Sequence, residues 1–227
     1  DHKDNGDTDK PFISLDDVFF AYPGTDKYAL EDISFDINKG EVIGIIGGTG
    51  SGKSTLINLL PRFYDASKGT VRINGIPVQD YPINRLRGMF GIVPQKAVLF
   101  SGSIADNLRY YKEDATIEEI KRALEIAQAR DFVERLPQGH DTLINQGGRN
   151  LSGGQRQRIT IARALVRNPE ILILDDSFSA LDYVTDANLR QALRENCKDT
   201  TVIIVSQRAN TIKNADKIIV LDDGKIA

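Results

Sequence analysis

The chain has 227 residues, of which 41% are hydrophobic and 27% are charged, and its formal net charge is −3 at pH 7. This composition is typical of a globular protein with a sizeable core, and it excludes collagen-like, coiled-coil and wholly disordered chains. The charge gives no electrostatic reason to expect a nucleic-acid partner, no apolar run is long enough to span a membrane, and a single cysteine, Cys197, favours a reducing compartment.

The first part of the chain predicts a polar arm followed mainly by strands. Residues 1–10 are polar and charged without periodicity, which indicates a linker outside a domain that covers residues 11–227. Alternating apolar residues and short apolar runs predict the elements that follow. They are strands over residues 12–20, Ile33–Ile37 and Val42–Ile46, a helix over Ser54–Leu60, and strands over Thr70–Ile73 and Phe90–Val93.

Helices and fully apolar strands alternate in the second part of the chain. Thr116 and Glu119 form the pattern of a capping box and predict the start of a helix that runs to Gln128. The remaining predicted elements are a helix over Gly153–Val166, a strand over Ile171–Leu174, a helix over Tyr183–Arg194, a strand over Thr201–Val205 and a closing pair around Asp222-Asp223-Gly224. Such alternation predicts an α/β fold: a parallel sheet covered on both faces, with a peripheral antiparallel β subdomain and a helical insertion over roughly residues 95–168.

Residues 47–54 read Gly-Gly-Thr-Gly-Ser-Gly-Lys-Ser and match the phosphate-binding P-loop pattern between a predicted strand and a predicted helix. Glycines allow backbone N–H groups to surround a polyphosphate, and the helix that follows presents its positive end to the same anion. Lys53 supplies a positive charge for the β- and γ-phosphates, and the Ser54 hydroxyl is suited to Mg²⁺. The alternative, a flexible Gly/Ser loop, does not explain this context, so the sequence predicts a P-loop NTPase core.

A second metal ligand is predicted at the end of an apolar strand. Asp175 follows Ile171–Leu174, the position at which a Walker B carboxylate emerges from a sheet. An apolar run that ends in aspartate is a weak signal by itself, but it becomes strong when a P-loop is also present.

Leu151-Ser152-Gly153-Gly154-Gln155 predicts a second anion-binding helix start, far from the first in sequence. With this string, residues 12–227 resemble the ATP-binding cassette (ABC) family, and Leu151–Gln155 is similar to its signature motif. The resemblance implies a Q-loop at Gln95, a D-loop over Ser179–Asp182, and stacking of Tyr22 on adenine. It implies ATP and Mg²⁺ as ligands, with metal contacts from Ser54, Gln95 and Asp175. The implied nucleotide-binding residues are Tyr22, Gly47, Gly48, Thr49, Gly50, Ser51, Gly52, Lys53, Ser54, Thr55, Gln95, Ser152, Gly153, Gly154, Gln155 and Asp182.

The same resemblance implies partners and a place in the cell. In this family two cassettes pair head to tail, and each ATP lies between the P-loop of one and the signature of the other. Leu99–Ile104 and the Thr142–Asn150 segment resemble exporter cassettes, although Gln146 stands where exporters usually have glutamate. Exporter cassettes are generally fused behind a transmembrane domain, so we expect this chain to be a fragment that works at the cytoplasmic face of a membrane.

Two residues depart from the family pattern where catalysis is concerned. The expected catalytic residues are Lys53, Asp176 and Gln207, but the family usually has glutamate at the position of Asp176 and histidine at that of Gln207. A shorter carboxylate misplaces the general base, and glutamine cannot carry a proton. We therefore hypothesise a degenerate, weakly hydrolysing ATP site in one subunit of a heterodimeric multidrug exporter, whose intact signature completes the partner's competent site. The alternatives are an ordinary ATPase of a homodimeric exporter and a purely regulatory ATP-binding module.

A DNA-repair or chromosome ATPase would need a long heptad insertion, which the sequence lacks.

Other polar residues have simpler interpretations. His2 lies in the arm and is expected to be solvated. His140 is interpreted as part of a surface turn, since no second His or Cys clusters with it to bind metal, and Cys197 is interpreted as a packing residue. Most of the arginines that follow the signature are expected to be solvated, although Arg156 is suited to steering phosphate; these arginines are Arg156, Arg158, Arg163 and Arg167.

Overall fold

The computed structural model describes residues 10–227, so nearly all of the predicted arm lies outside the described residues. Its centre is a six-stranded sheet in the order β12-β11-β3-β10-β9-β6, in which only β12 runs antiparallel to its neighbour. The strands are β3 (Val42–Gly47), β6 (Phe90–Val93), β9 (Ile171–Asp175), β10 (Thr201–Ser206), β11 (Lys217–Asp222) and β12 (Lys225–Ile226). The α/β fold with a mainly parallel sheet is therefore confirmed.

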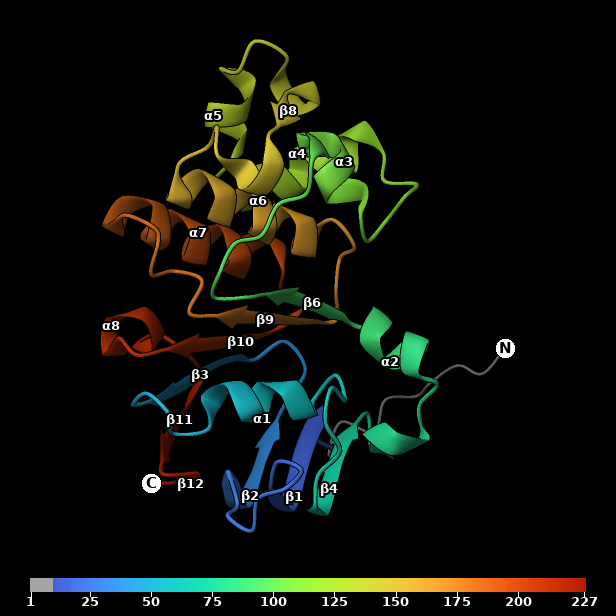
Figure 1. Cartoon of the computed structure of the whole chain (residues 1–227), viewed down its shortest axis with the longest axis vertical. Helices are drawn as coiled ribbons and strands as arrows, with labels where there is room; N and C mark the ends of the chain where they lie inside the picture. The colour runs from blue at the N-terminus through green and yellow to red at the C-terminus, as the bar shows by residue number, and fades with distance from the viewer. Residues whose placement is uncertain (1–9) are drawn as a thin grey trace.

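A second, antiparallel sheet lies beside the central one, in the order β2-β1-β4-β5. Its strands are β1 (Ile13–Phe20), β2 (Leu30–Ile37), β4 (Lys68–Ile73) and β5 (Ile76–Pro77). Apolar residues of helix α1 (Lys53–Leu59) share one buried cluster with residues of both sheets, so the helix packs between them (Figure 1). Strand β2 begins three residues earlier than predicted, because Asp32 at φ 54° interrupts the alternation on which the prediction depended.

Helices cover the opposite face of the central sheet (Figure 1). They are α3 (Ile104–Arg109), α4 (Ile117–Ile126), α5 (Arg130–Glu134), α6 (Gly153–Leu165) and α7 (Tyr183–Asn196), with a small ribbon of β7 (Gly102–Ser103) and β8 (Leu143–Ile144). The capping box before α4 forms as predicted, with the Glu119 N–H donating to Thr116 Oγ1 at 3.2 Å. In residues 10–227 no helix is long and apolar enough to cross a bilayer. The boundaries of the helical insertion stay a prediction.

Several short elements were not predicted. They are α2 (Ile83–Gly88), α3, α5, α8 (Ala209–Ile212) and the 3₁₀ turns at Val78–Asp80, Gly139–Asp141 and Gln146–Gly148. Each has at most six residues, which is fewer than two full turns of an α-helix. A periodic apolar face cannot be recognised over so short a segment.

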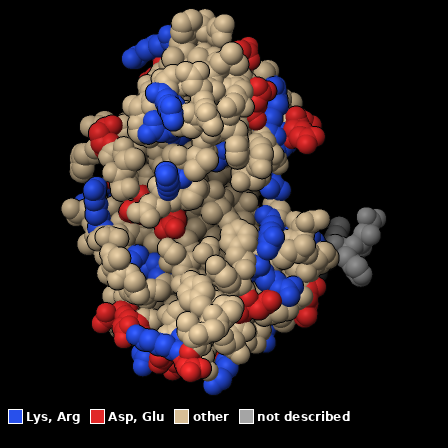
Figure 2. All heavy atoms as spheres, in the orientation of Figure 1, with Lys and Arg blue, Asp and Glu red and all other residues tan. Residues whose placement is uncertain are grey.

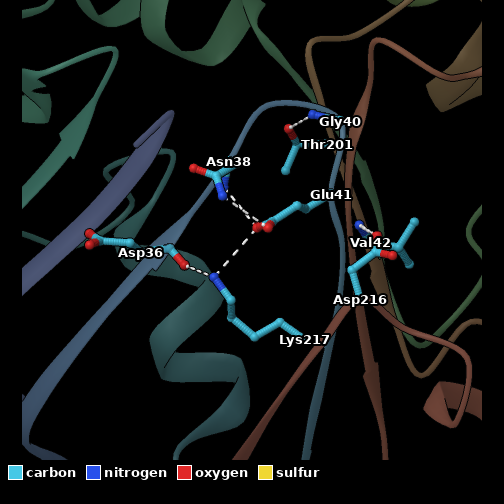
Figure 3. A network of polar contacts seen from close by, with 8 residues as sticks. All are labelled: Asp36, Asn38, Gly40, Glu41, Val42, Thr201, Asp216 and Lys217. Atoms are coloured by element: carbon cyan, nitrogen blue, oxygen red, sulfur yellow. Dashed lines mark hydrogen bonds and ion pairs between the residues drawn. The ribbon is translucent and has the colours of Figure 1, made fainter. Parts of the chain in front are cut away.

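A polar network ties the two sheets together at the amino end of the central strands (Figure 3). Lys217 of β11 donates from Nζ to the Asp36 carbonyl of β2 at 2.6 Å, and the same Nζ lies 3.5 Å from Glu41 Oε2. Glu41 in turn accepts from the Asn38 N–H at 2.8 Å. The network fixes the turn between β2 and β3. It therefore holds β3, the strand that leads to the P-loop, in a defined position relative to both sheets.

Replacing Thr201 by valine is expected to lower the free energy of unfolding by about 1–2 kcal/mol. Thr201 is fully buried, and its Oγ1 accepts from the Gly40 N–H at 3.0 Å, so valine leaves that donor without its partner. Thr142→Val is the matched control, because Thr142 Oγ1 is buried without a hydrogen-bonding partner in the described part of the chain. Urea unfolding measures both variants, and equal destabilisation of the two would contradict the prediction.

Candidate functional site

Four parallel strands bring their carboxyl ends to one edge of the central sheet. Ile46 of β3 pairs with Ser206 of β10, Val205 of β10 pairs with Asp175 of β9, and Leu174 of β9 pairs with Val93 of β6. The segments that follow these strands contain the glycine-rich loop, Gln207, Asp176 and Gln95, respectively. Such an edge is the usual ligand site of an open α/β sheet.

The loop between β3 and α1 has one packed side and one open side. A Cβ on Gly47 would lie 2.4 Å from the Leu221 carbonyl oxygen, so this glycine is required by close packing. Gly52 precedes α1 at φ 103°, a backbone conformation that residues with a side chain rarely adopt. Cβ atoms on Gly48 and Gly50 would meet nothing within 4 Å, so the loop leaves room for an anion beside these residues.

Lys53 brings a buried ammonium group to the loop. Its Nζ donates to the Gly47 and Gly48 carbonyl oxygens, at 2.7 Å each, and lies 3.4 Å from Ser51 Oγ. All three acceptors are neutral oxygens, so these hydrogen bonds do not neutralise the positive charge, which suits it to binding an anion.

A cavity of about 460 Å³ opens beside the loop. Tyr22 is at its wall, and the Tyr22 hydroxyl is 2.8 Å from Thr55 Oγ1 of α1. The Tyr22 ring packs edge-on against Phe20, with the ring centroids 4.9 Å apart. The predicted residues that line the cavity are Tyr22, Gly50, Gly52, Lys53, Ser54 and Thr55, and those missed by the sequence analysis are Thr25, Lys27, Tyr28, Ala29, Asp223 and Gly224. The missed residues form no local motif, and only the pairing of distant strands brings them to the loop.

Asp175 and Asp176 form a pair of carboxylates at the end of β9. Burial raises the pKa of the Asp175 carboxyl, the charge of Asp176 raises it further, and Lys53 lowers it. Asp176 has a left-handed backbone at φ 46°, and its Oδ2 accepts from Gln95 Nε2 at 3.3 Å. The predicted Q-loop residue and the predicted general base are therefore in contact, whereas Gln207 is exposed after β10.

The residues present fit Mg²⁺ held together with a nucleotide. The Ser54 hydroxyl, the Asp175 carboxylate and the Gln95 amide are oxygen donors of the type that Mg²⁺ prefers, and Mg²⁺ usually takes few protein ligands beside substrate phosphates. Within residues 10–227 no cluster of three or more His, Cys, Asp or Glu side chains is suited to hold a metal by itself.

The predicted signature lies on the other side of the sheet from the P-loop. Ser152 caps α6: its N–H donates to Gln155 Oε1 at 2.9 Å, and its Oγ accepts from the Gln155 N–H at 3.2 Å. A Cβ on Gly154 would lie 3.2 Å from the Ala180 carbonyl oxygen, so the predicted D-loop packs on this helix start. Helix α6 belongs to one buried cluster and α1 to the other, so a single chain does not bring its two helix starts together.

Asp182 has a structural role at the start of α7. Its Oδ1 accepts from the Val184 and Thr185 N–H groups at 3.1 and 3.0 Å, and its Oδ2 accepts from Thr185 Oγ1 at 2.7 Å. These hydrogen bonds, first those from Thr185, lower the pKa of the Asp182 carboxyl. Its predicted contact with nucleotide stays a prediction.

Charged side chains of both signs are present on the face of the molecule seen in Figure 2. Basic and acidic side chains are interspersed on the face in view in Figure 2, and the basic ones do not gather into one continuous patch there. Of the arginines after the signature, Arg163 is buried, with its guanidinium 5.2 Å from the Phe100 ring centroid, so the expectation of a solvated side chain is wrong for this residue. Arg156 donates to the Leu151 carbonyl at 2.7 Å, which places it beside the signature.

Comparisons with known proteins agree with this geometry. A family model described as ABC transporter matches residues 30–179. The chain is 45% identical to an ATP-dependent lipid A-core flippase of Chromobacterium violaceum, over 95% of this chain and 37% of that protein. It is also 45% identical to a probable multidrug resistance ABC transporter ATP-binding/permease protein of Bacillus subtilis, over 100% of this chain and 38% of that protein. A solved bacterial Atm1-family ABC exporter with ATP bound superposes with a TM-score of 0.90 at 40% identity, over 95% of this chain and 38% of that chain. The chain thus spans less than half the length of these relatives.

Proposed function

The chain belongs to the ABC transporter family as a nucleotide-binding domain of the exporter type, and we propose that it binds MgATP and hydrolyses it to power a membrane exporter. The observation that carries this proposal is the alignment of four strand ends, which gathers the P-loop, Asp175, Asp176 and Gln95 at one edge. Tyr22 stacks on adenine, Lys53 binds the terminal phosphates, and Ser54, Asp175 and Gln95 hold Mg²⁺.

The proposed hydrolysis depends on positioning and charge. Lys53 and the loop amides balance the negative charge that spreads over the γ-phosphate oxygens in the transition state. Asp176 orients the attacking water and accepts its proton, and Gln207 donates a hydrogen bond from its amide to the γ-phosphate. Mg²⁺ would neutralise charge on the β- and γ-phosphates.

A second cassette is proposed to complete the site. Support comes from the separation of the two helix starts in one chain, since the Ser152 end of α6 and the P-loop belong to different layers. The signature, from Ser152 to Gln155, would then contact ATP held by the partner's P-loop. The flippase and ATP-binding/permease names of the longer relatives support fusion or association with a transmembrane exporter domain, which would hold the cassette at the cytoplasmic face of a membrane.

The finer proposal is that this chain's own site is degenerate and that its partner is a different subunit. Asp176 is one methylene shorter than the usual glutamate, and its carboxylate is already bonded to Gln95. An aspartate also tolerates the left-handed backbone at this position better than most residues. Binding residues are retained while the base and the proton-carrying histidine are replaced. The two alternatives are an ordinary homodimeric ATPase and a purely regulatory ATP-binding module. The rate of phosphate release distinguishes both of them from a degenerate site.

The experiment that tests the proposed function measures ATP binding and phosphate release by the purified chain. We expect ATP to displace a fluorescent ATP analogue, and phosphate release to be slow and to stop when EDTA removes Mg²⁺. A chain that does not bind ATP would overturn the proposal. Phosphate release as fast without Mg²⁺ as with it would contradict the assigned metal site.

Replacing Tyr22 by alanine is expected to raise the Kd for ATP about tenfold, because alanine removes the surface on which the base stacks. Tyr22→Phe should bind ATP nearly as well, since it keeps the ring and loses only the hydroxyl contact with Thr55. Tyr110, an exposed tyrosine stacked on Phe100 in the helical layer, provides the control variant Tyr110→Ala. Equal ATP affinity of the Tyr22→Ala and Tyr110→Ala variants would remove Tyr22 from the site.

A further inference from the structure

The hairpin of β11 and β12 packs directly against the phosphate loop. Leu221 of β11 pairs with Gly47 at the start of the loop. In the turn that follows, the Gly224 N–H donates to the Ser51 carbonyl at 3.0 Å. The Gly224 carbonyl accepts from the Glu31 N–H of β2 at 2.8 Å, so one residue links the loop to the second sheet.

This link fixes the middle of the loop at the wall of the cavity, which Gly224 also lines. Ser51 is buried, and it donates its own N–H to the Gly48 carbonyl at 3.2 Å. The Ser51 N–H is therefore bonded to Gly48 and the Ser51 carbonyl to Gly224, so both backbone polar groups of Ser51 have partners. A glycine-rich loop has a large conformational freedom to lose, so its binding-competent shape depends on such outside contacts.

The contact leaves no room for a side chain at residue 224. Gly224 is buried at φ 80°, and a Cβ there would lie 2.6 Å from the Ala29 carbonyl oxygen. Gly52 of the loop packs into the same place, since its own Cβ would lie 2.8 Å from Leu30 Cδ2 and 3.7 Å from Gly224 Cα. The turn, the start of β2 and the phosphate loop thus form one tightly packed unit.

We propose that Gly224 is a positioning residue for triphosphate binding: it holds the Ser51 carbonyl and thereby sets the shape of the phosphate loop. The inference rests on the proposed function, because it takes the loop's ligand to be the phosphates of ATP. Gly224 acts through the loop backbone and does not itself contact the reacting atoms.

The chain offers a closely matched control for a test of this role. Asn74 and Gly75 form the tight turn between β4 and β5 with φ angles of 51° and 73°, and Asp223 and Gly224 form theirs with 40° and 80°. Alanine introduces the same backbone strain at either glycine, but a Cβ on Gly75 would meet nothing within 4 Å. The two turns therefore match in type, whereas Gly224 donates to the loop and a Cβ there would meet the Ala29 carbonyl oxygen.

The experiment compares the Kd for ATP and for AMP in the native chain, Gly224→Ala and Gly75→Ala, at a temperature well below the Tm of each. We expect Gly224→Ala to raise the Kd for ATP about tenfold, the scale on which loss of an outer supporting partner acts at a binding site. The Kd for AMP, which lacks the β- and γ-phosphates, should stay unchanged, and Gly75→Ala should behave as the native chain. The Tm is expected to fall in both variants.

A purely structural role would lower the Tm of Gly224→Ala and leave its ATP affinity equal to that of Gly75→Ala, and this result would overturn the inference. If Gly224→Ala does not fold, glycolic acid in place of Gly224 replaces the N–H that donates to Ser51 by an ester oxygen, which cannot donate, without adding a side chain. Native ATP affinity in this ester variant would also overturn the inference. Failure of the native chain to bind ATP would instead overturn the proposed function, so the two failures are distinguishable.

Discussion

Replacing Asp176 by glutamate and Gln207 by histidine in the same chain is expected to raise the rate of phosphate release from MgATP by about 100-fold. Glutamate extends the carboxylate by more than about 1 Å toward the attacking water, and a displacement of that size can change a rate by this factor. Histidine adds a group that can carry a proton, which the Gln207 amide cannot. The measurement is phosphate release at matched concentrations, with ATP binding confirmed for both proteins.

Two single variants separate the contributions. Asp176→Glu alone is expected to recover most of the rate, since the base must be positioned before the histidine can assist. Because glutamate is less suited than aspartate to φ 46°, the Tm of this variant should be compared with that of the native chain. Equal phosphate release by the native chain and the double variant would contradict the degenerate site and would favour an ordinary ATPase that pairs with itself.

The variant Lys53→Ala is expected to raise the Kd for ATP by about 100-fold, which corresponds to about 2.7 kcal/mol of lost binding free energy. Lys53 is the buried ammonium of the loop, and it also donates to the Gly47 and Gly48 carbonyls, so its removal loses charge and loop order together. Displacement of a fluorescent ATP analogue measures the effect.

Lys27→Ala is the matched control for this variant. Lys27 lines the same cavity, but its side chain is 78% exposed and its ion pair with Asp223 spans 3.6 Å in solvent. A solvated charge of this kind contributes little, so the Kd should change by less than about threefold. Equal losses in Lys53→Ala and Lys27→Ala would show that general positive charge, and not the placement of Lys53, attracts the nucleotide.

The sequence predicted the elements whose signals are local. The strand, glycine-rich loop and helix from Val42 to Leu60 are consecutive in the chain, and their order alone indicates a phosphate site. The capping box at Thr116 also lies within four consecutive residues, and it forms in the structure. A second capping box, at Ser152, has an equally local pattern but was not predicted. Parallel pairing followed from the fully apolar strands, because both faces of such a sheet are buried.

Contacts between distant backbones could not be predicted in this way. Gly224 and Ser51 are far apart in the chain, and the hydrogen bond between them joins backbone atoms only. The residue types therefore do not indicate that the two pair. The burial of Arg163 under Phe100 and Tyr111 has the same cause: an arginine in a helix usually indicates a solvated face, and only the fold of the preceding loop supplies the two rings. Three-dimensional packing decides such positions, and a local pattern does not.

The central sheet separates two buried clusters that alternate along single strands. In β9, Leu172 and Leu174 belong to the helical side, while Ile171 and Ile173 belong to the side of α1 and the second sheet. Unfolding of either layer would expose apolar residues of the central strands. The same strands also supply the apolar residues against which the other layer packs. We therefore expect the two layers to unfold as one cooperative unit, so that the stability gained when a nucleotide binds beside α1 extends to the helices on the far face.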